Sequence, residues 1–242
     1  MKLLFVGDSL TKGLIGASFV ELLKQDHPDW IIKNAGENGY TLRNVSYRLA
    51  KEIEEDSDYN FIVIEVGHND IILPYFDKRG LFFRFALRYL VRNGRRPVDP
   101  KTFHRKYAQM IQSIQSKSNA KIILTTIGCI NENLSSIPNR NRIEYNESIV
   151  QVANDYHCLV ADVSGEMESV LTETGQTDYL LNNFLNTVYF DKKECRTDGG
   201  AERMSRKRNL HLTIDGIHLN SAGAMLYKQT IERQINKIAA SM

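Results

Sequence analysis

Short runs of apolar residues alternate along the chain with longer stretches in which apolar residues recur every three or four positions. The short runs predict buried β-strands, and the recurring pattern predicts helices that are apolar on one face. The predicted strands are residues 2–6, 30–33, 61–66, 121–126 and 158–163. The clearest strand is 61–66, because five of its six residues are apolar and most are β-branched or aromatic.

Amphipathic patterns predict a helix between each pair of strands and another at the end of the chain. The first pattern runs from Phe19 to Leu23 and ends near residues 26–29. The remaining predicted helices are residues 42–54, with Thr41 as cap, and residues 102–116, 140–156 and 221–240. The core candidates of the helix at 140–156 are Ile143, Ile149, Val150 and Val152.

This alternation of strands and helices is typical of an α/β fold with a parallel sheet and helices on both faces. A length of 242 residues suits a single domain over residues 1–242. Sheets of this kind bind ligands beyond the carboxyl ends of their strands. Two stretches, approximately 71–100 and 172–211, do not fit the minimal alternation, so we interpret them as insertions near that edge.

The composition is that of an ordinary globular protein, with 42% hydrophobic residues, 25% charged residues and a net charge of +2. The charge balance predicts no strongly charged partner. Cys129, Cys158 and Cys195 show no pairing or metal-ligand pattern, and an odd number of thiols fits a reducing compartment. Only four apolar residues separate Lys2 from Gly7, too few for a secretion signal, and no apolar stretch is long enough to cross a membrane. We therefore expect a cytoplasmic protein; the sequence does not indicate its oligomeric state.

The candidate nucleophile is Ser9, which follows the first predicted strand on a tight turn. A serine hydroxyl is a poor nucleophile until a base removes its proton. His218 is the candidate base, and Asp215, three positions earlier, can orient one nitrogen of its ring. The alternatives are that Ser9 caps the first helix, and that Asp215 begins a turn leading into the last helix.

Acyl transfer also needs hydrogen-bond donors for the oxyanion that develops. Asn69 offers a side-chain amide, Gly39 a backbone N–H with no side chain in the way, and Ser9 its own N–H. These three residues follow the third, second and first predicted strands, so they are expected to meet at one edge of the sheet. The alternatives are a plain turn glycine at Gly39 and a helix cap at Asn69 and Asp70.

Four short strings, in this order, resemble the sequence blocks of the GDSL or SGNH hydrolases, a superfamily of serine esterases, lipases and acetylesterases. Residues 7–10 (Gly-Asp-Ser-Leu) match the first block, and residues 38–41 (Asn-Gly-Tyr-Thr) are similar to the second. Residues 67–70 (Gly-His-Asn-Asp) match the third, and residues 215–218 (Asp-Gly-Ile-His) match the fifth. The resemblance spans nearly the whole chain. It implies a three-layer α/β/α sandwich with a flavodoxin-like, five-stranded parallel sheet.

The same resemblance implies a role for each site residue. Ser9 would be the nucleophile, His218 the base and Asp215 the residue that orients it. The oxyanion hole would be formed by Ser9, Gly39 and Asn69. Such chemistry uses neither a metal ion nor an organic cofactor.

Smaller features of these blocks bear on the substrate. His68 fills the variable position of the third block, and it either contacts the substrate or only packs. Asp8 is a second candidate for substrate contact. Gly36 is a less favoured alternative to Gly39 for the second block.

The two insertions are both rich in basic residues. Residues 79–96 contain six arginines and no acid, and Arg84, Arg88 and Arg92 line one helical face. We expect a helix packed on the body and bordering the cleft, with docking to a membrane as the less favoured interpretation. In residues 172–211 acids partly balance the basic residues, which favours a solvated, mobile loop. Nucleic-acid binding would need a larger basic excess with stacking aromatics and is not expected.

The sequence thus predicts a serine ester hydrolase that cleaves a small-molecule acyl ester through an acyl-enzyme, with a carbohydrate O-acetylesterase as first candidate. Alternatives on the same fold are a lipase or thioesterase for longer acyl chains, and an O-acyltransferase. The alternatives from other classes are a non-catalytic carbohydrate-binding module and a metal-dependent phosphatase. The phosphatase is disfavoured because a histidine is expected two residues after Asp8, where Leu10 stands.

Overall fold

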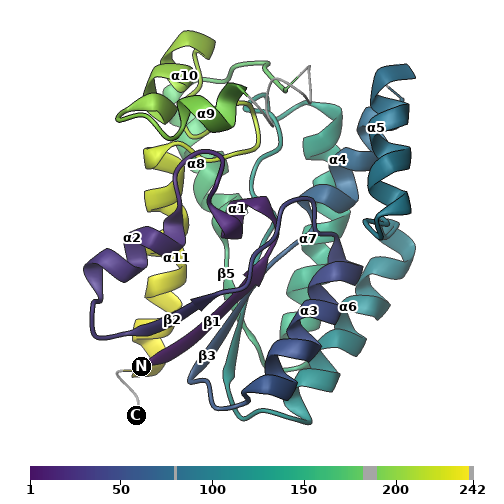
Figure 1. Ribbon diagram of the computed structural model, residues 1–242, viewed down its shortest axis with the longest axis vertical. Helices are drawn as coiled ribbons and strands as arrows, with labels where there is room; N and C mark the ends of the chain where they lie inside the picture. Colours follow the sequence, from purple (N-terminus) through teal and green to yellow (C-terminus); the bar gives the residue numbers. More distant parts are fainter. Residues whose placement is uncertain (79–80, 182–189, 240–242) are drawn as a thin grey trace.

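A five-stranded parallel sheet forms the centre of the computed structural model, which describes residues 1–78, 81–181 and 190–239 (Figure 1). The strands are β1 (Lys2–Gly7), β2 (Ile31–Asn34), β3 (Phe61–Glu65), β4 (Lys121–Thr125) and β5 (Leu159–Ala161). Their order is β2-β1-β3-β4-β5, and every neighbouring pair is parallel. All five predicted strands are confirmed, and with them the α/β fold class.

Helices cover both faces of the sheet, so the fold has three layers (Figure 1). The helices of the described residues are α1 (Ser9–Lys12), α2 (Phe19–Asp26), α3 (Leu42–Glu55), α4 (His68–Asp77), α5 (Leu81–Arg92), α6 (Pro100–Gln115), α7 (Ile137–Asp155), α8 (Val163–Thr174), α9 (Lys192–Glu194), α10 (Gly200–Arg208) and α11 (Ser221–Ala239). On one face α11 packs against β4 and β5, flanked by α2 and α8. On the other face lie α3, α6 and α7. Because both faces are covered, all five residues of β3 are buried, as its apolar sequence predicts.

The strand order reverses at β1, whose neighbours β2 and β3 continue in opposite directions along the sheet. Gly7 and Glu65 are paired at the carboxyl ends of β1 and β3, so the loops after these two strands leave the sheet side by side. A crevice at such a reversal is the usual ligand site of open α/β sheets. None of the helices in the described ranges has the combination of length and apolar character needed to cross a membrane.

The first insertion packs on the body of the protein, as expected. Its helix α5 lies against α4, where the ring of Phe83 stacks on Phe76 with 5.0 Å between ring centroids. Arg84, Arg88 and Arg92 are exposed on the helix, as their spacing predicts. Arg79, which the sequence analysis included in this basic segment, lies outside the described residues.

The expectation of a solvated, mobile loop at 172–211 is wrong for residues 190–208. These residues form the two helices α9 and α10, which lie above the carboxyl ends of the strands on the side opposite α5 (Figure 1). The Arg208 guanidinium pairs with both carboxylate oxygens of Asp191, at 2.9 and 3.0 Å. Arg208 also donates to the backbone oxygen of Ile214, at 2.6 Å. The acids that balance the basic residues therefore hold this segment in place.

Two of the four core candidates of α7 are wrong. Ile149 and Val152 are buried, but Ile143 is 56% exposed and Val150 is 39% exposed. The centre of the buried face of α7 is a row of positions spaced by three or four residues, namely Pro138, Arg142, Tyr145, Ile149 and Val152, with Asn139 and Ala153 buried beside it. Ile143 and Val150 each lie one position beyond a buried residue, which turns their side chains away from the sheet. Arg142 occupies a position of the buried face although it is charged, because its guanidinium donates hydrogen bonds to Ile127, Ser164 and Glu168. An analysis of apolar residues alone therefore assigns the buried face of α7 to the wrong positions.

Candidate active site

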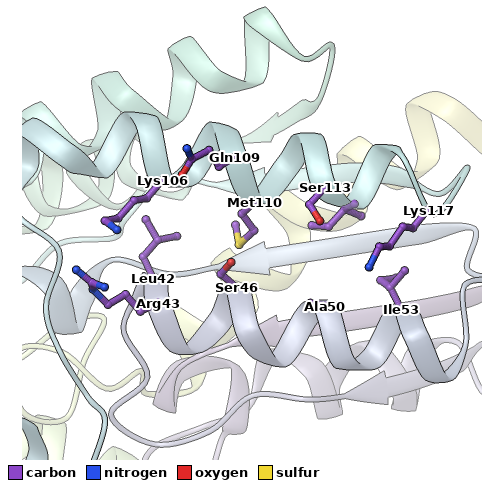
Figure 2. A pocket seen from close by; sticks show the side chains of 11 residues that line it. Leu42, Arg43, Ser46, Ala50, Ile53, Lys106, Gln109, Met110, Ser113 and Lys117 are labelled. Atoms are coloured by element: carbon purple, nitrogen blue, oxygen red, sulfur yellow. The ribbon is translucent and has the colours of Figure 1, made fainter.

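A cavity of about 460 Å³ opens at the carboxyl ends of β1 and β3, and its lining includes Ser9, Gly39, Asn69 and His218. A second cavity of about 340 Å³ lies between α3 and α6, whose side chains face each other across it (Figure 2). Among the described residues its lining contains serines and basic residues but no histidine and no carboxylate, so it holds no serine–histidine–carboxylate set. The first cavity is therefore the candidate active site.

Ser9, His218 and Asp215 form a continuous hydrogen-bonded series in the first cavity. The Ser9 Oγ lies 3.0 Å from His218 Nε2, and His218 Nδ1 lies 2.8 Å from Asp215 Oδ2. Asp215 is fully buried, while Ser9 and His218 keep 8% and 7% of their surface exposed. The series thus runs from the interior to the cavity, with the hydroxyl at its open end.

A tight loop fixes the Asp215 carboxylate. Its Oδ1 accepts hydrogen bonds from the backbone N–H groups of Ile217 and His218, at 3.0 and 2.8 Å. Gly216 has φ +86°, and a Cβ at this position would lie 2.3 Å from the backbone oxygen of Tyr179. Only glycine fits there, so the loop holds the carboxylate and the imidazole in one arrangement.

The charges of this pair are mutually stabilised. Burial alone would lower the pKa of His218, but the charge of Asp215 and the hydrogen bond to it outweigh burial, and the pKa of His218 lies above 6.5. Burial would likewise raise the pKa of Asp215, yet the charge of His218 and three hydrogen bonds hold that pKa below its ordinary value. Asp215 is therefore ionised at neutral pH and stabilises a protonated imidazole.

Ser9 does not cap the first helix, so that alternative is wrong. Asp8 is the N-cap residue of α1, and its Oδ1 accepts the backbone N–H of Leu10 at 3.0 Å. Ser9 is the first residue of α1, where backbone N–H groups have no partner within the helix. Its N–H is therefore available to an incoming oxygen while its side chain faces His218.

Two further donors border the cavity. Gly39 has φ +73°, a left-handed conformation that favours glycine, and lies at the cavity wall. Asn69 Nδ2 donates to Asp8 Oδ2 at 3.1 Å and to the backbone oxygen of Tyr40 at 2.9 Å. Both hydrogens of this amide are thus occupied, and binding of an oxyanion requires one of them to change partner.

Asp70 does not cap α4 either, because the N-cap residue of that helix is Gly67. Its two carboxylate oxygens accept the backbone N–H of Leu42 at 2.9 Å and that of Val98 at 2.7 Å. Complete burial raises the pKa of Asp70 to about 7. Asp70 thereby joins the start of α3 to the chain that follows α5.

Glu65, the last residue of β3, was missed by the sequence analysis. Its Oε2 accepts from the Thr11 hydroxyl at 2.9 Å and from the Asp8 N–H at 3.3 Å, and its Oε1 lies 3.1 Å from His68 Nδ1. It thereby ties the Ser9 turn to the first turn of α4, which carries Asn69. A charged residue ending an otherwise apolar, fully buried strand was the available signal.

The structure corrects one expected substrate contact and retains the other. Asp8 is fully buried and does not line the cavity, so it holds Asn69 and Leu10 rather than a substrate. His68 does line the cavity, and its buried Nε2 has no hydrogen-bond partner among the described residues. Contact of this nitrogen with a substrate stays a prediction.

Asp8, Glu65 and His68 form a buried group whose candidate ligand atoms lie within 4.8 Å of one another, a set that could hold a cation. Burial, followed by the charge of Glu65, raises the pKa of Asp8 well above its ordinary range. Burial would also raise the pKa of Glu65, but the hydrogen bond from His68 and its charge hold that pKa below the ordinary value. The carboxylate oxygens already accept protein donors, so we derive no metal chemistry from this group.

A second carboxylate, Glu132, was also missed and holds the loop that leads to Asp215. It is fully buried, and its Oε1 accepts the N–H of Leu212 at 2.9 Å and the N–H of Thr213 at 2.8 Å. Its Oε2 accepts the N–H of His211 at 2.7 Å. From α10, the Ser205 hydroxyl donates to the backbone oxygen of Thr213 at 2.6 Å. No local pattern signals these contacts, because the partners come from distant parts of the chain.

Both insertions contribute to the cavity wall, so the expectation that residues 79–96 border the cleft is confirmed. Tyr89 and Leu90 of α5 line one part of it, together with Asn93 and Arg95 of the chain that follows. Lys192 of α9 lines another part. The segments that depart from the minimal fold therefore shape the site.

A model of the GDSL-like lipase/acylhydrolase family matches residues 5–226. The acetyl xylan esterase AlAXEase is similar in structure, with a TM-score of 0.67 and 18% sequence identity over 97% of this chain and 100% of that one. The acetylxylan esterase Axe2 from Geobacillus stearothermophilus has a TM-score of 0.63 and 19% identity over 97% and 93% of the two chains. An α/β hydrolase, LAE5, from the metagenome of Lake Arreo, Spain, has a TM-score of 0.62 and 18% identity over 95% and 92%. Among curated protein sequences, none matches this chain.

Proposed function

Because the chain belongs to the GDSL-like lipase/acylhydrolase family and is a serine esterase, we propose that Ser9, His218 and Asp215 hydrolyse a carboxylic ester through an acyl-enzyme. The observation that carries this proposal is the series of hydrogen bonds from Ser9 Oγ through His218 to Asp215, at 3.0 and 2.8 Å. A hydroxyl, a base and an orienting carboxylate in this arrangement make up the machinery of acyl transfer.

In the first step, His218 Nε2 takes the hydroxyl proton while Ser9 Oγ attacks the carbonyl carbon of the ester. The developing oxyanion is bound by the N–H groups of Ser9 and Gly39 and by the side-chain amide of Asn69. The tetrahedral intermediate then loses its alcohol, whose oxygen receives the proton from His218. The acyl group remains bound to Ser9 as an ester.

In the second step, His218 takes a proton from a water molecule, which attacks the acyl carbon on Ser9. The Ser9–acyl bond breaks, the proton returns to Ser9 Oγ, and the carboxylic acid leaves. Asp215 stays ionised throughout and stabilises the imidazolium that forms in each step, in keeping with the pKa of His218 above 6.5.

The acyl group is the finer part of the proposal. An acetyl ester of a carbohydrate is the first candidate, supported by the likeness in fold to acetyl xylan esterases. A longer acyl chain is the second, supported by the apolar wall that Ile72, Leu73, Phe76 and Leu90 give the cavity. A wall of this kind adds to the affinity for an acyl chain with each methylene that it buries.

Hydrolysis of 4-nitrophenyl esters from acetyl to decanoyl, by the wild type, Ser9→Ala and Ser46→Ala, tests the proposal. Ser46 lies on α3 in the other cavity and serves as the matched serine control. We expect cleavage by the wild type, a loss of about 10³-fold or more in kcat for Ser9→Ala, and less than a twofold change for Ser46→Ala. Full activity of Ser9→Ala would overturn the proposal, and the preferred chain length decides between the two acyl groups.

An acyltransferase uses the same acyl-enzyme and differs only in the second step. Adding glycerol or xylose to the assay separates the two activities by their products. Free carboxylic acid as the main product supports hydrolysis, whereas an ester of the added alcohol as the main product would assign the chain as a transferase.

A further inference from the structure

The cavity around Ser9 has an unbalanced charge. Arg95 and Lys192 are among its lining residues, whereas no aspartate or glutamate of the described ranges is. Both histidines of the lining, His68 and His218, can only add to the positive charge. A neutral ester has no charged group that could pair with these cations.

Arg95 is fixed at the wall of the cavity beside the candidate oxyanion hole. Its Nε donates to the backbone oxygen of Asn38 at 3.3 Å, and its Nη1 donates to that of Asn93 at 3.2 Å. The guanidinium also lies over the ring of Tyr40, 5.9 Å from the centroid. A Cβ on Gly39 would lie 3.2 Å from Arg95 Nε, so the guanidinium is held next to this backbone. Its Nη2 has no hydrogen-bond partner in the described ranges.

Nearby acids do not neutralise these two cations. Residues 79–96, which contain Arg95, include no acid at all. On the other side, Asp191 is engaged by Arg208 and Glu194 by Arg203, so neither is paired with Lys192. Within the described part of the chain, neither Arg95 nor Lys192 forms a salt bridge.

We propose that this esterase acts on anionic esters, in which Arg95 and Lys192 attract a phosphate or carboxylate group of the substrate while the ester carbonyl lies at Ser9. This inference rests on the proposed function and names the class of its substrate. Arginine recognises phosphate and carboxylate oxygens through its fixed donors, and lysine adds a compact charge. In a partly enclosed cavity these attractions are stronger than in bulk water, and they raise the local concentration of an anionic substrate.

The two cations are placed differently relative to the reacting bond. Arg95 is beside Gly39, on the side of the candidate oxyanion donors. Lys192 shares the cavity lining with Leu181, whose N–H donates at 2.9 Å to the backbone oxygen of Asp215 in the catalytic loop. The anionic group can therefore belong to the acyl part or to the alcohol part of the ester, and the substrates below distinguish the two.

The first experiment compares kcat/KM for a neutral ester, 4-nitrophenyl butanoate, with two anionic ones. The monoester of 4-nitrophenol with glutaric acid carries a carboxylate on its acyl part, and 3-carboxy-4-nitrophenyl butanoate carries one on its alcohol part. All three esters are measured with the wild type, with Arg95→Gln/Lys192→Gln, with Arg95→Lys and with Arg88→Gln/Lys193→Gln. The last variant is a matched control, because Arg88 and Lys193 belong to the same two insertions but do not line the cavity.

We expect the ratio of anionic to neutral kcat/KM, for at least one of the two anionic esters, to fall about tenfold in Arg95→Gln/Lys192→Gln. The control should change this ratio by less than twofold, and Arg95→Lys should retain most of it. Higher salt should lower the ratio in the wild type and in the control, which keep both cations, but not in Arg95→Gln/Lys192→Gln. Whichever ester shows the effect identifies the part of the substrate that carries the charge.

A binding measurement tests the preference for an anionic group without any catalysis. Ser9→Ala, with Arg95 and Lys192 intact, is titrated calorimetrically with hexyl phosphate and with 1-hexanol, and the titrations are repeated after Arg95→Gln/Lys192→Gln. We expect tighter binding of hexyl phosphate, lost when the two cations are replaced. Absence of serine-dependent hydrolysis would refute the proposed function and leave this preference measurable. Equal ratios in all variants together with no preference for hexyl phosphate would overturn the inference.

Discussion

Glu132 accepts hydrogen bonds from the backbone N–H and the side-chain hydroxyl of Thr213, at 2.8 and 2.7 Å, although 81 positions separate the two residues. This buried carboxylate fixes the chain that leads to Asp215 and His218. The precision of the candidate triad therefore depends on a residue that has no contact with a substrate.

Replacing Glu132 by Gln should lower both stability and activity. The amide nitrogen of Gln cannot accept a hydrogen bond, so at least one backbone N–H of the loop would be buried without a partner. We expect a loss of about 1–3 kcal/mol in the free energy of unfolding and a fall in Tm of about 3–10 °C. Thermal unfolding and kcat at a temperature where both proteins are folded measure the two effects.

The matched control for this change is Glu147→Gln, at an exposed position of α7. It should change Tm by less than 1–2 °C, in the range of ordinary surface substitutions. If Glu132→Gln behaved like this control, the carboxylate would not be the anchor of the loop.

The acid limb of the pH–activity profile should lie above pH 6.5. His218 must be neutral to accept the Ser9 proton, and its pKa is raised above 6.5 by Asp215, so kcat/KM should rise with pH through this higher value. In Asp215→Asn the charge is lost, and the acid limb should move to lower pH while kcat falls about 10³–10⁴-fold. A pH–rate profile of kcat/KM for each protein measures both effects. Asp29→Asn, an exposed carboxylate, is the control, and an unmoved limb in Asp215→Asn would contradict the assignment.

Asp70 should make the protein less stable as the pH rises from about 4 to about 7. Its pKa in the folded protein is about 7, above the value of 3.8 expected in the unfolded chain, so the folded state holds a proton that the unfolded state releases. The effect is at most about 1.4 kcal/mol per pH unit in this window and is constant above it. Urea unfolding at pH 5 and pH 8 measures the free energy of unfolding of the wild type and of Asp70→Asn. The value of the wild type minus that of the variant should be smaller at pH 8 than at pH 5. A difference that grows with pH would mean that Asp70 is ionised when folded.

Gly39→Ala should reduce kcat more than it reduces stability. Alanine at φ +73° is strained by about 1 kcal/mol, and its Cβ would lie 3.2 Å from Arg95 Nε beside the candidate oxyanion hole. Gly175→Ala is the matched control, because Gly175 also has a positive φ, +105°, but nothing lies within 4 Å of its added Cβ. We expect similar falls in Tm for the two variants, and a fall in kcat of about tenfold or more only for Gly39→Ala. Equal kcat values for Gly39→Ala and Gly175→Ala would contradict a role of Gly39 in the oxyanion hole.

Much of the fold follows from local pattern. The apolar runs predicted all five strands, and the helical periodicity predicted α2, α3, α6, α7 and α11 to within a few residues. Thr41 is the N-cap residue of α3, as predicted. These predictions were correct for one reason. The periods of strands and helices are set by local backbone geometry, so a short stretch of sequence shows which of its residues will face the core.

The errors share a reason as well. On α7, the buried Arg142 looks polar in sequence, and the exposed Ile143 and Val150 look apolar, because only the packed structure shows which partners satisfy a charge. In residues 172–211, a pattern of mixed charges predicted a solvated loop, whereas its Arg208 is held by Asp191. A charge pattern does not reveal which of its members are paired across space.

The sequence by itself determined the order of the elements and the residues that end each strand. Parallel strands bring their carboxyl ends to one edge, so Ser9, Gly39 and Asn69 meet there whatever the side chains around them. Only the tertiary structure decided which groups support them. Glu65 and Glu132 are buried beside backbone N–H groups from remote segments, and a carboxylate in the interior is tolerated only where the fold supplies such donors. Those donors are fixed by how the loops pack, which no local stretch of the chain encodes.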